Sequence, residues 1–129
     1  MDSDVLVVDD SAAIRKILTR VLRQTGMAIQ TIHEAGDGQE ALAMMAQHRV
    51  DLVLSDINMP KMDGLQLLAS LKASPQWHHI PVVMITTEGG ETKVAEAVRL
   101  GAAGYVRKPF TADQIKEKLV GLLEPAAAL

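Results

Sequence analysis

Three carboxylates, one hydroxyl and one amine follow short apolar runs at separate places in the sequence. Asp9 and Asp10 follow the first run, Asp56 follows a second, and Thr86 and Lys108 follow two others. Oxygen ligands without cysteine or histidine suit a hard divalent cation, so the acids predict a Mg²⁺ site, with Mn²⁺ as the alternative. Because Mg²⁺ usually keeps some water and pairs with phosphoryl oxygens, these residue types indicate a site for a phosphoryl group.

Each of these residues also has an ordinary structural role. An aspartate after a strand often caps the next helix, so Asp9 or Asp10 alone indicates little. Asp56 suits the start of an Asx turn, Thr86 is typical of strands, and a lysine such as Lys108 is usually solvated. The functional interpretation therefore depends on all five residues meeting in one place.

The elements that must position these residues alternate between strand and helix patterns. Apolar runs predict five strands, and apolar residues spaced three and four apart predict five helices, with short connections between them. Thr111 is expected to cap the last helix, and Gly26 to end the first. The predicted strands are 5–8, 29–33, 52–54, 82–85 and 105–107, and the predicted helices centre on 14–22, 40–47, 65–71, 92–100 and 115–123.

Continuous apolar strands separated by helices predict a doubly wound α/β fold, with a parallel sheet covered on both faces. Ligands of such folds bind beyond the carboxyl ends of the strands, near the point where the strand order reverses. In the common order 2-1-3-4-5, the strands before Asp9 and Asp56 are neighbours. Two unit charges about 4 Å apart repel by roughly 4 kcal/mol at an effective dielectric near 20, which favours a bound cation between these acids.

Composition narrows the possible classes of protein. The 129 residues are enough for one domain, which is predicted to span 1–129. The net charge of −3 does not favour binding to nucleic acid or to an acidic membrane surface. The absence of cysteine excludes disulfides and thiolate sites and fits a cytoplasmic protein. The amino end does not resemble a signal peptide, and no apolar run reaches the roughly 18 residues of a membrane helix.

In their order and placement, these residues resemble the receiver domain of bacterial response regulators, and most closely the single-domain chemotaxis regulators. The resemblance implies a flavodoxin-like fold, with five helices and a five-stranded parallel sheet in the order 2-1-3-4-5. It covers residues 5 to about 123 and rests on Asp9-Asp10-Ser11, Asp56-Ile57-Asn58-Met59-Pro60, Asp63-Gly64, Thr86 and Lys108-Pro109.

The resemblance implies a role for each acid. Asp56 would be the phosphoacceptor, taking a phosphoryl group from a phosphohistidine on a sensor histidine kinase. Asp10, Asp56 and the backbone carbonyl of Asn58 would bind Mg²⁺ directly, while Asp9 would act mostly through a coordinated water. Asn58 and Glu88 occupy the positions that set the dephosphorylation rate in this family.

The resemblance also implies a switch. Lys108, aimed by a cis peptide bond to Pro109, would neutralise charge on the phosphoryl group. Thr86 would move toward that group, and Tyr105 would turn inward behind it, so that the surface of the last two helices and the strand between them changes its affinity for partners. The ordinary alternative is that Tyr105 is only a half-exposed strand residue.

These roles describe a phosphoacceptor in signal transduction rather than an enzyme. The expected partners are a sensor histidine kinase, a downstream protein such as a flagellar motor switch protein and a phosphatase, with a monomer as the expected state. The alternative is a receiver fragment of a longer regulator, or a phosphorelay intermediate outside chemotaxis.

Three other functions fit less well. A flavodoxin-type electron carrier needs a phosphate-binding loop after the first strand and aromatic residues around its flavin, where this chain has two acids. A phosphatase with an aspartate nucleophile carries an Asp-x-Asp pattern after the first strand, whereas here the acids are adjacent and Asp56 is separate. An inert receiver-like module usually lacks one of the acids or the lysine, and this chain has them all.

Overall fold

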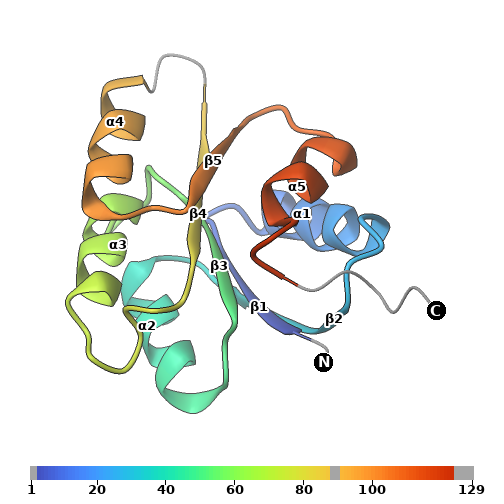
Figure 1. Cartoon of the computed structure of the whole chain (residues 1–129). Coiled ribbons are helices and arrows are strands. Elements are labelled where there is room, and N and C mark those ends of the chain that lie inside the picture. Colours follow the sequence, from blue (N-terminus) through green and yellow to red (C-terminus); the bar gives the residue numbers. More distant parts are fainter. Residues whose placement is uncertain (1–2, 88–90, 124–129) are drawn as a thin grey trace.

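The computed structural model describes residues 3–87 and 91–123, in which five strands alternate with five helices (Figure 1). None of the helices in these two ranges is long and apolar enough to cross a membrane. The strands are β1 (Ser3–Val8), β2 (Ile29–Ala35), β3 (Leu52–Asp56), β4 (Val82–Thr86) and β5 (Gly104–Arg107), and the helices are α1 (Ala12–Gln24), α2 (Gly38–Gln47), α3 (Gly64–Lys72), α4 (Glu91–Leu100) and α5 (Ala112–Leu119).

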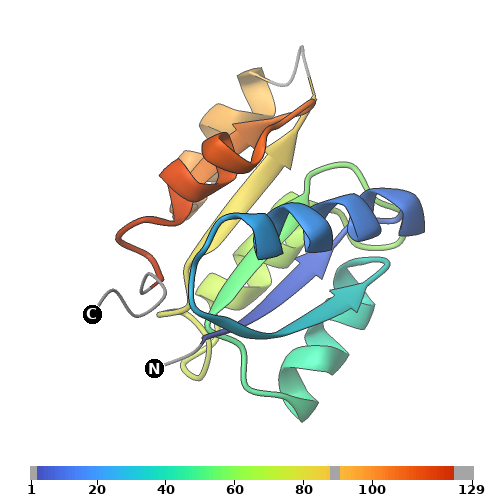
Figure 2. The same ribbon diagram turned by 90° about the vertical axis from the view of Figure 1, so that its right-hand side faces the viewer.

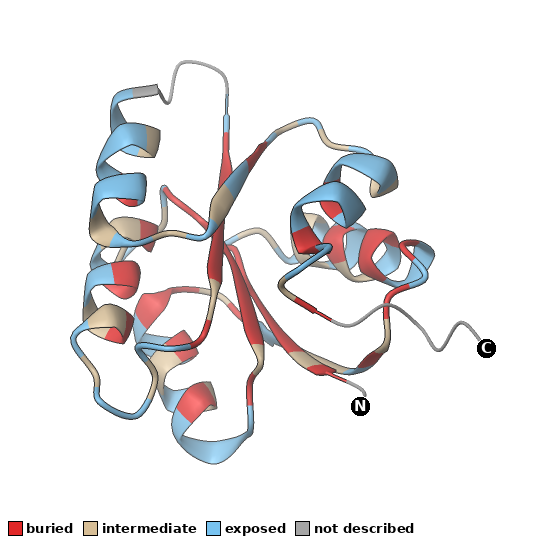
Figure 3. Cartoon of the chain, in the orientation of Figure 1, coloured by how far each residue is buried: buried red, intermediate tan, exposed pale blue. Residues whose placement is uncertain are grey.

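All the strand pairs are parallel, and the sheet has the order β2-β1-β3-β4-β5. Helices α1 and α5 cover one face, while α2, α3 and α4 cover the other (Figures 1 and 2). Strands β3 and β4 are buried along their whole length, as Figure 3 shows, because both faces are covered there. The doubly wound fold and strand order predicted from the sequence are therefore confirmed.

Alternation along the strands builds a separate core on each face of the sheet. In β1, Val5 and Val7 pack with the residues of α1 and α5, whereas Leu6 and Val8 pack with the residues of α2, α3 and α4. This division follows from the two-residue period of a strand, in which neighbouring side chains point to opposite faces. Both cores consist mainly of aliphatic side chains, and Trp77 packs at the margin of the second.

Four helices begin at a residue whose side chain accepts a hydrogen bond from a backbone N–H three positions later, which satisfies one of the donors exposed at a helix start. The predicted cap at Thr111 is one of them, and Gly26, with φ of 75°, follows the end of α1 as predicted. The capping residues are Ser11, Asp37, Asp63 and Thr111.

Several element boundaries differ from the sequence prediction, by two residues in β1, β2 and β3 and by more in α5. Strand β2 continues beyond His33 because Glu34 and Ala35 also pair with β1. Helix α5 ends at Leu119 rather than at Leu123, because the backbone leaves the helical region at Val120, with ψ of 124°, and Gly121 then has a φ of 91°. Leu123 is nevertheless buried. Its spacing from the apolar residues of α5 therefore reflects packing of the turn that follows the helix, and not a longer helix.

Candidate functional site

The predicted site residues meet at the carboxyl edge of the sheet. Asp9 and Asp10 follow β1, Asp56 ends β3, Thr86 ends β4 and Lys108 follows β5. One oxygen from each of the three aspartates lies within 4.8 Å of the others. In the ranges that the structure describes, no other group of three acidic, histidine or cysteine residues is close enough to hold a metal ion.

Asp9 is the most firmly held of the three acids. Its side chain is 1% exposed. Its Oδ1 accepts a hydrogen bond from the backbone N–H of Ser11 at 2.9 Å, and its Oδ2 accepts one from Lys108 Nζ at 3.1 Å. Its backbone carbonyl accepts a further bond from Arg15 Nη1 at 2.5 Å. Asp10, by contrast, is exposed to solvent, so of these two neighbours it is the better placed for direct metal coordination.

Asp56 is a nearly buried carboxylate with an unfavourable charge. Its Oδ1 accepts a hydrogen bond from Ile57 N at 2.8 Å and lies 3.6 Å from Lys108 Nζ. Burial raises the pKa of Asp56 above its ordinary value of 3.8. The positive charge of Lys108 and the hydrogen bond from Ile57 oppose this shift. Repulsion from Asp9 and Asp10 adds to it. A cation bound between the acids would offset both the cost of burying the Asp56 carboxylate and its repulsion by Asp9 and Asp10.

This raised pKa predicts that Asp56→Asn stabilises the metal-free protein. The folded state holds the proton of Asp56 more tightly than the unfolded chain does, so the carboxylate lowers stability increasingly as pH rises from 3.8 through the raised folded value. We expect the variant to melt at a higher temperature at pH 7, with the difference vanishing as pH falls toward 3.8. Melting curves of both proteins in EDTA across this pH range test the prediction. If the charge of the carboxylate were not the cause of the higher melting temperature, the difference between the two proteins would be the same at every pH.

Lys108 joins the last strand to the acids. Its Nζ lies 3.1 Å from Asp9 and 3.6 Å from Asp56, and its backbone N–H donates to the carbonyl of Thr86 at 2.7 Å. The Lys108–Pro109 peptide bond is cis, as the sequence resemblance led us to expect. Lysine and two of the acids therefore form one charged group.

The two predicted switch residues lie on neighbouring strands in different environments. Thr86 is buried, and its hydroxyl donates to the carbonyl of Thr87 at 3.2 Å. Tyr105 is 38% exposed and lies on the surface, with Lys118 Nζ 5.7 Å from its ring centre. The tyrosine is thus turned outward in this structure.

Asn58 has a partner that the sequence did not reveal. Its side chain is exposed, and its Oδ1 accepts a hydrogen bond from Lys93 Nζ at 2.5 Å. A lysine in an amphipathic helix is usually solvated, so no sequence signal connected Lys93 with the site. Glu88, the other residue predicted to set the dephosphorylation rate, lies outside the described residues.

The loop after β3 is fixed by a close approach of backbones. Gly64 N–H donates to the carbonyl of Ile57 at 2.7 Å. A Cβ atom on Gly64 would lie 2.2 Å from the carbonyl oxygen of Asp56, so only glycine fits there without a rearrangement. Gly38 N–H donates to the carbonyl of Met62 at 3.1 Å, which ties the same loop to the start of α2. These contacts fix the chain on both sides of Asn58.

The acidic group fits a divalent cation on two grounds. Three carboxylates against one ammonium leave two negative charges unbalanced, and the available donors are all oxygen. Hard cations such as Mg²⁺ and Mn²⁺ prefer such donors. The side chains that could hold the ion are those of Asp9, Asp10 and Asp56.

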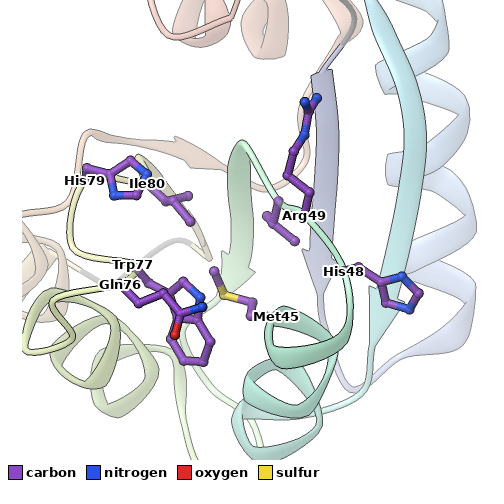
Figure 4. Close-up of a pocket in the computed structure, with 8 residues that line it drawn as sticks. Met45, His48, Arg49, Gln76, Trp77, His79 and Ile80 are labelled. Carbon is purple, nitrogen blue, oxygen red and sulfur yellow. The ribbon is translucent and has the colours of Figure 1, made fainter.

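A hollow between the turns that precede β3 and β4 lies at the other end of the sheet (Figure 4). Met45 and Trp77 are among the apolar residues that line it, and His48, Arg49 and His79 are among the polar ones. Its volume of about 200 Å³ is below the roughly 300–1,000 Å³ typical of small-molecule sites. We assign no role to it.

The fold and the site together define a class: a five-stranded parallel α/β protein with an acidic cluster and a lysine at the carboxyl edge of its sheet. The chain belongs to the response regulator receiver domain family, whose model matches residues 5–120. This is a family of signalling proteins.

Two chemotaxis proteins are similar to this chain over most of its length. The chemotaxis protein CheY-3 of Vibrio cholerae serotype O1 is 41% identical over 120 residues, which cover 93% of this chain and 91% of the relative. The chemotaxis protein CheY of Pseudomonas aeruginosa is 39% identical over 120 residues, which cover 93% and 95%. The solved structure of the chemotaxis response regulator CheY4 of Vibrio cholerae is 33% identical, with a TM-score of 0.83 over 95% of this chain and 100% of that one.

Proposed function

We propose that this protein is a response regulator of a two-component system, that Asp56 accepts a phosphoryl group from a sensor histidine kinase, and that the reaction requires Mg²⁺. The observation that carries the proposal is the group formed by Asp56, the two neighbouring acids and Lys108 at the edge of the sheet. A carboxylate nucleophile, oxygen ligands for a cation and a fixed ammonium are the parts that phosphoryl transfer needs.

The transfer step follows from these parts. A carboxylate oxygen of Asp56 attacks the phosphorus of the phosphohistidine, the new O–P bond forms, and the N–P bond breaks as the imidazole leaves with its electron pair. Later, water attacks the aspartyl phosphate, which releases inorganic phosphate and restores the carboxylate. Lys108, 3.6 Å from Asp56, is positioned to offset negative charge on the transferred group.

The metal would be held by Asp10, Asp56 and the backbone carbonyl of Asn58, with Asp9 acting mostly through a coordinated water. Mg²⁺ bound at this place would neutralise charge on the phosphoryl oxygens. Both side-chain oxygens of Asp9 already accept bonds from protein donors, which supports this indirect role.

The proposed output is a change in a protein-binding surface. Thr86 would bond a phosphoryl oxygen, and Tyr105 would turn inward, which would alter the surface of α4, β5 and α5. The chemotaxis relatives favour a partner such as a flagellar motor switch protein, with a phosphatase as a further partner. The alternative is a receiver piece of a longer regulator, or a phosphorelay intermediate. Three further expectations stay predictions: a single domain over 1–129, a monomeric state and a cytoplasmic location.

Intact mass spectrometry tests the proposal. The protein is incubated with acetyl phosphate, with and without Mg²⁺, beside the Asp56→Asn variant. We expect a gain of one phosphoryl group in the native protein with Mg²⁺ and none in the variant or in EDTA. A gain in the variant would place the acceptor elsewhere, and no gain in any sample, together with no binding of beryllofluoride, would leave an inert interaction module.

Mg²⁺ is also expected to stabilise the fold. At ten times its dissociation constant, a ligand that binds only the folded state adds about 1.4 kcal/mol to the free energy of unfolding. Asp10→Asn should remove most of this response and leave the metal-free fold as stable or more stable, because it also removes repulsion. Urea titrations with and without Mg²⁺ measure both effects. A large loss of metal-free stability in the variant would mean that Asp10 is mainly structural.

A further inference from the structure

We infer that Lys93 is a positioning residue that engages the side chain of Asn58 and thereby lengthens the lifetime of the phosphoryl group on Asp56. This inference rests on the proposed function, since it concerns hydrolysis of that aspartyl phosphate. It adds a residue of α4 to the residues that act at the site.

The observation is the bond between Lys93 Nζ and Asn58 Oδ1, at 2.5 Å. Lys93 lies in the first turn of α4, and Asn58 lies two residues after Asp56, so the bond links two segments 35 positions apart in the chain. The loop at Asn58 is fixed by Gly64 N–H, which donates to the carbonyl of Ile57. The ammonium therefore meets an asparagine whose backbone is already held in place.

The chemistry of the two groups gives the bond a direction. An ammonium only donates hydrogen bonds, and an asparagine side chain has one accepting atom, Oδ1. The contact thus turns Oδ1 toward Lys93. Water that attacks an aspartyl phosphate is oriented best by an acceptor for one of its protons. The charge-assisted bond to Lys93 uses one of the two lone pairs of Oδ1 and holds that oxygen toward α4. Asn58 is therefore a poorer acceptor for that water, and hydrolysis is slower.

Both side chains are exposed, so the expected effect is modest. We expect Lys93→Met, which keeps an unbranched side chain about as long as the aliphatic part of lysine and removes the donor, to lose its phosphoryl group two to five times faster than the native protein. This ratio corresponds to about 0.4–1 kcal/mol, the range measured for exposed charged contacts.

The experiment follows the decay of the phosphorylated protein. Native protein and variants are phosphorylated with acetyl phosphate and Mg²⁺, the donor is removed by rapid desalting, and intact mass is recorded over time. Lys93→Arg keeps a cationic donor and should restore a lifetime near the native one. Arg99→Met removes a positive charge from the exposed surface of the same helix, about 9 Å further along it, and is the matched control.

A double-mutant cycle separates positioning from a general effect of charge. In an Asn58→Ala background, whose backbone carbonyl is unchanged, Lys93→Met should no longer alter the lifetime. An equal acceleration in that background, or in Arg99→Met, would overturn the inference, as would native decay in Lys93→Met. A native protein that never gains a phosphoryl group would contradict the proposed function itself, and the inference with it.

Discussion

Gly64→Ala is expected to lower the free energy of unfolding by about 3 kcal/mol or more. The added Cβ would lie 2.2 Å from the carbonyl oxygen of Asp56 and 2.8 Å from the Cα of Ile57. Both are backbone atoms, so neither can move aside by changing a rotamer. Overpacking of a core typically costs about 1–3 kcal/mol, and a clash with backbone belongs at the upper end or beyond it.

Urea unfolding in EDTA measures this loss, with Gly104→Ala as the control. A Cβ on Gly104 would meet only the side chain of Lys118, at 3.9 Å, so this variant should unfold within about 1 kcal/mol of the native protein. Gly64→Ala should also slow phosphorylation, because the clash acts on the backbone of Asp56. A native unfolding midpoint for Gly64→Ala would mean that the loop rearranges easily and does not fix the site.

Lys108→Met is expected to have the second large effect, a loss of about 3 kcal/mol in the metal-free protein. The variant leaves Asp9, 1% exposed, without the ammonium at 3.1 Å, and breaking a buried ion pair from one side typically costs 3–5 kcal/mol. The lower end applies because the site borders solvent at Asp10.

The stabilisation by Mg²⁺ is the second quantity to measure for this variant. In Lys108→Met the three acids lack their lysine, so Mg²⁺ should raise the free energy of unfolding more than it does in the native protein. Lys116→Met removes an exposed positive charge from α5 and should change either quantity little. If both lysine variants lose the same stability, the pair with Asp9 contributes no more than a surface charge, and the assigned role of Lys108 is wrong.

The sequence predicted the arrangement of the site well because the site follows from topology. Residues at the carboxyl ends of parallel strands must share one edge of the sheet, so Asp9, Asp56 and Lys108 could be brought together from the apolar runs that precede them. The helix start at Thr111 could also be predicted from the sequence, because its side chain caps the backbone of a residue only three positions away.

What the sequence did not predict depends on how elements pack against one another. The bond from Lys93 to Asn58 requires the rotation of α4 about its axis and its height above the loop after β3, and neither is encoded in helical periodicity. The close contact at Gly64 likewise appears only once α3 is packed against β3. The outward position of Tyr105 is a choice between rotamers that an alternating strand pattern leaves open.

The ion pair between Asp9 and Lys108 joins residues 99 positions apart. Strand β5, which Lys108 follows, is at the edge of the sheet and pairs there with β4. During synthesis on the ribosome the acids therefore emerge long before the lysine that pairs with Asp9. Docking of the last strand brings in the one ammonium that offsets part of the acids' charge, so the charge at the site depends on the pairing of β5 at the edge of the sheet.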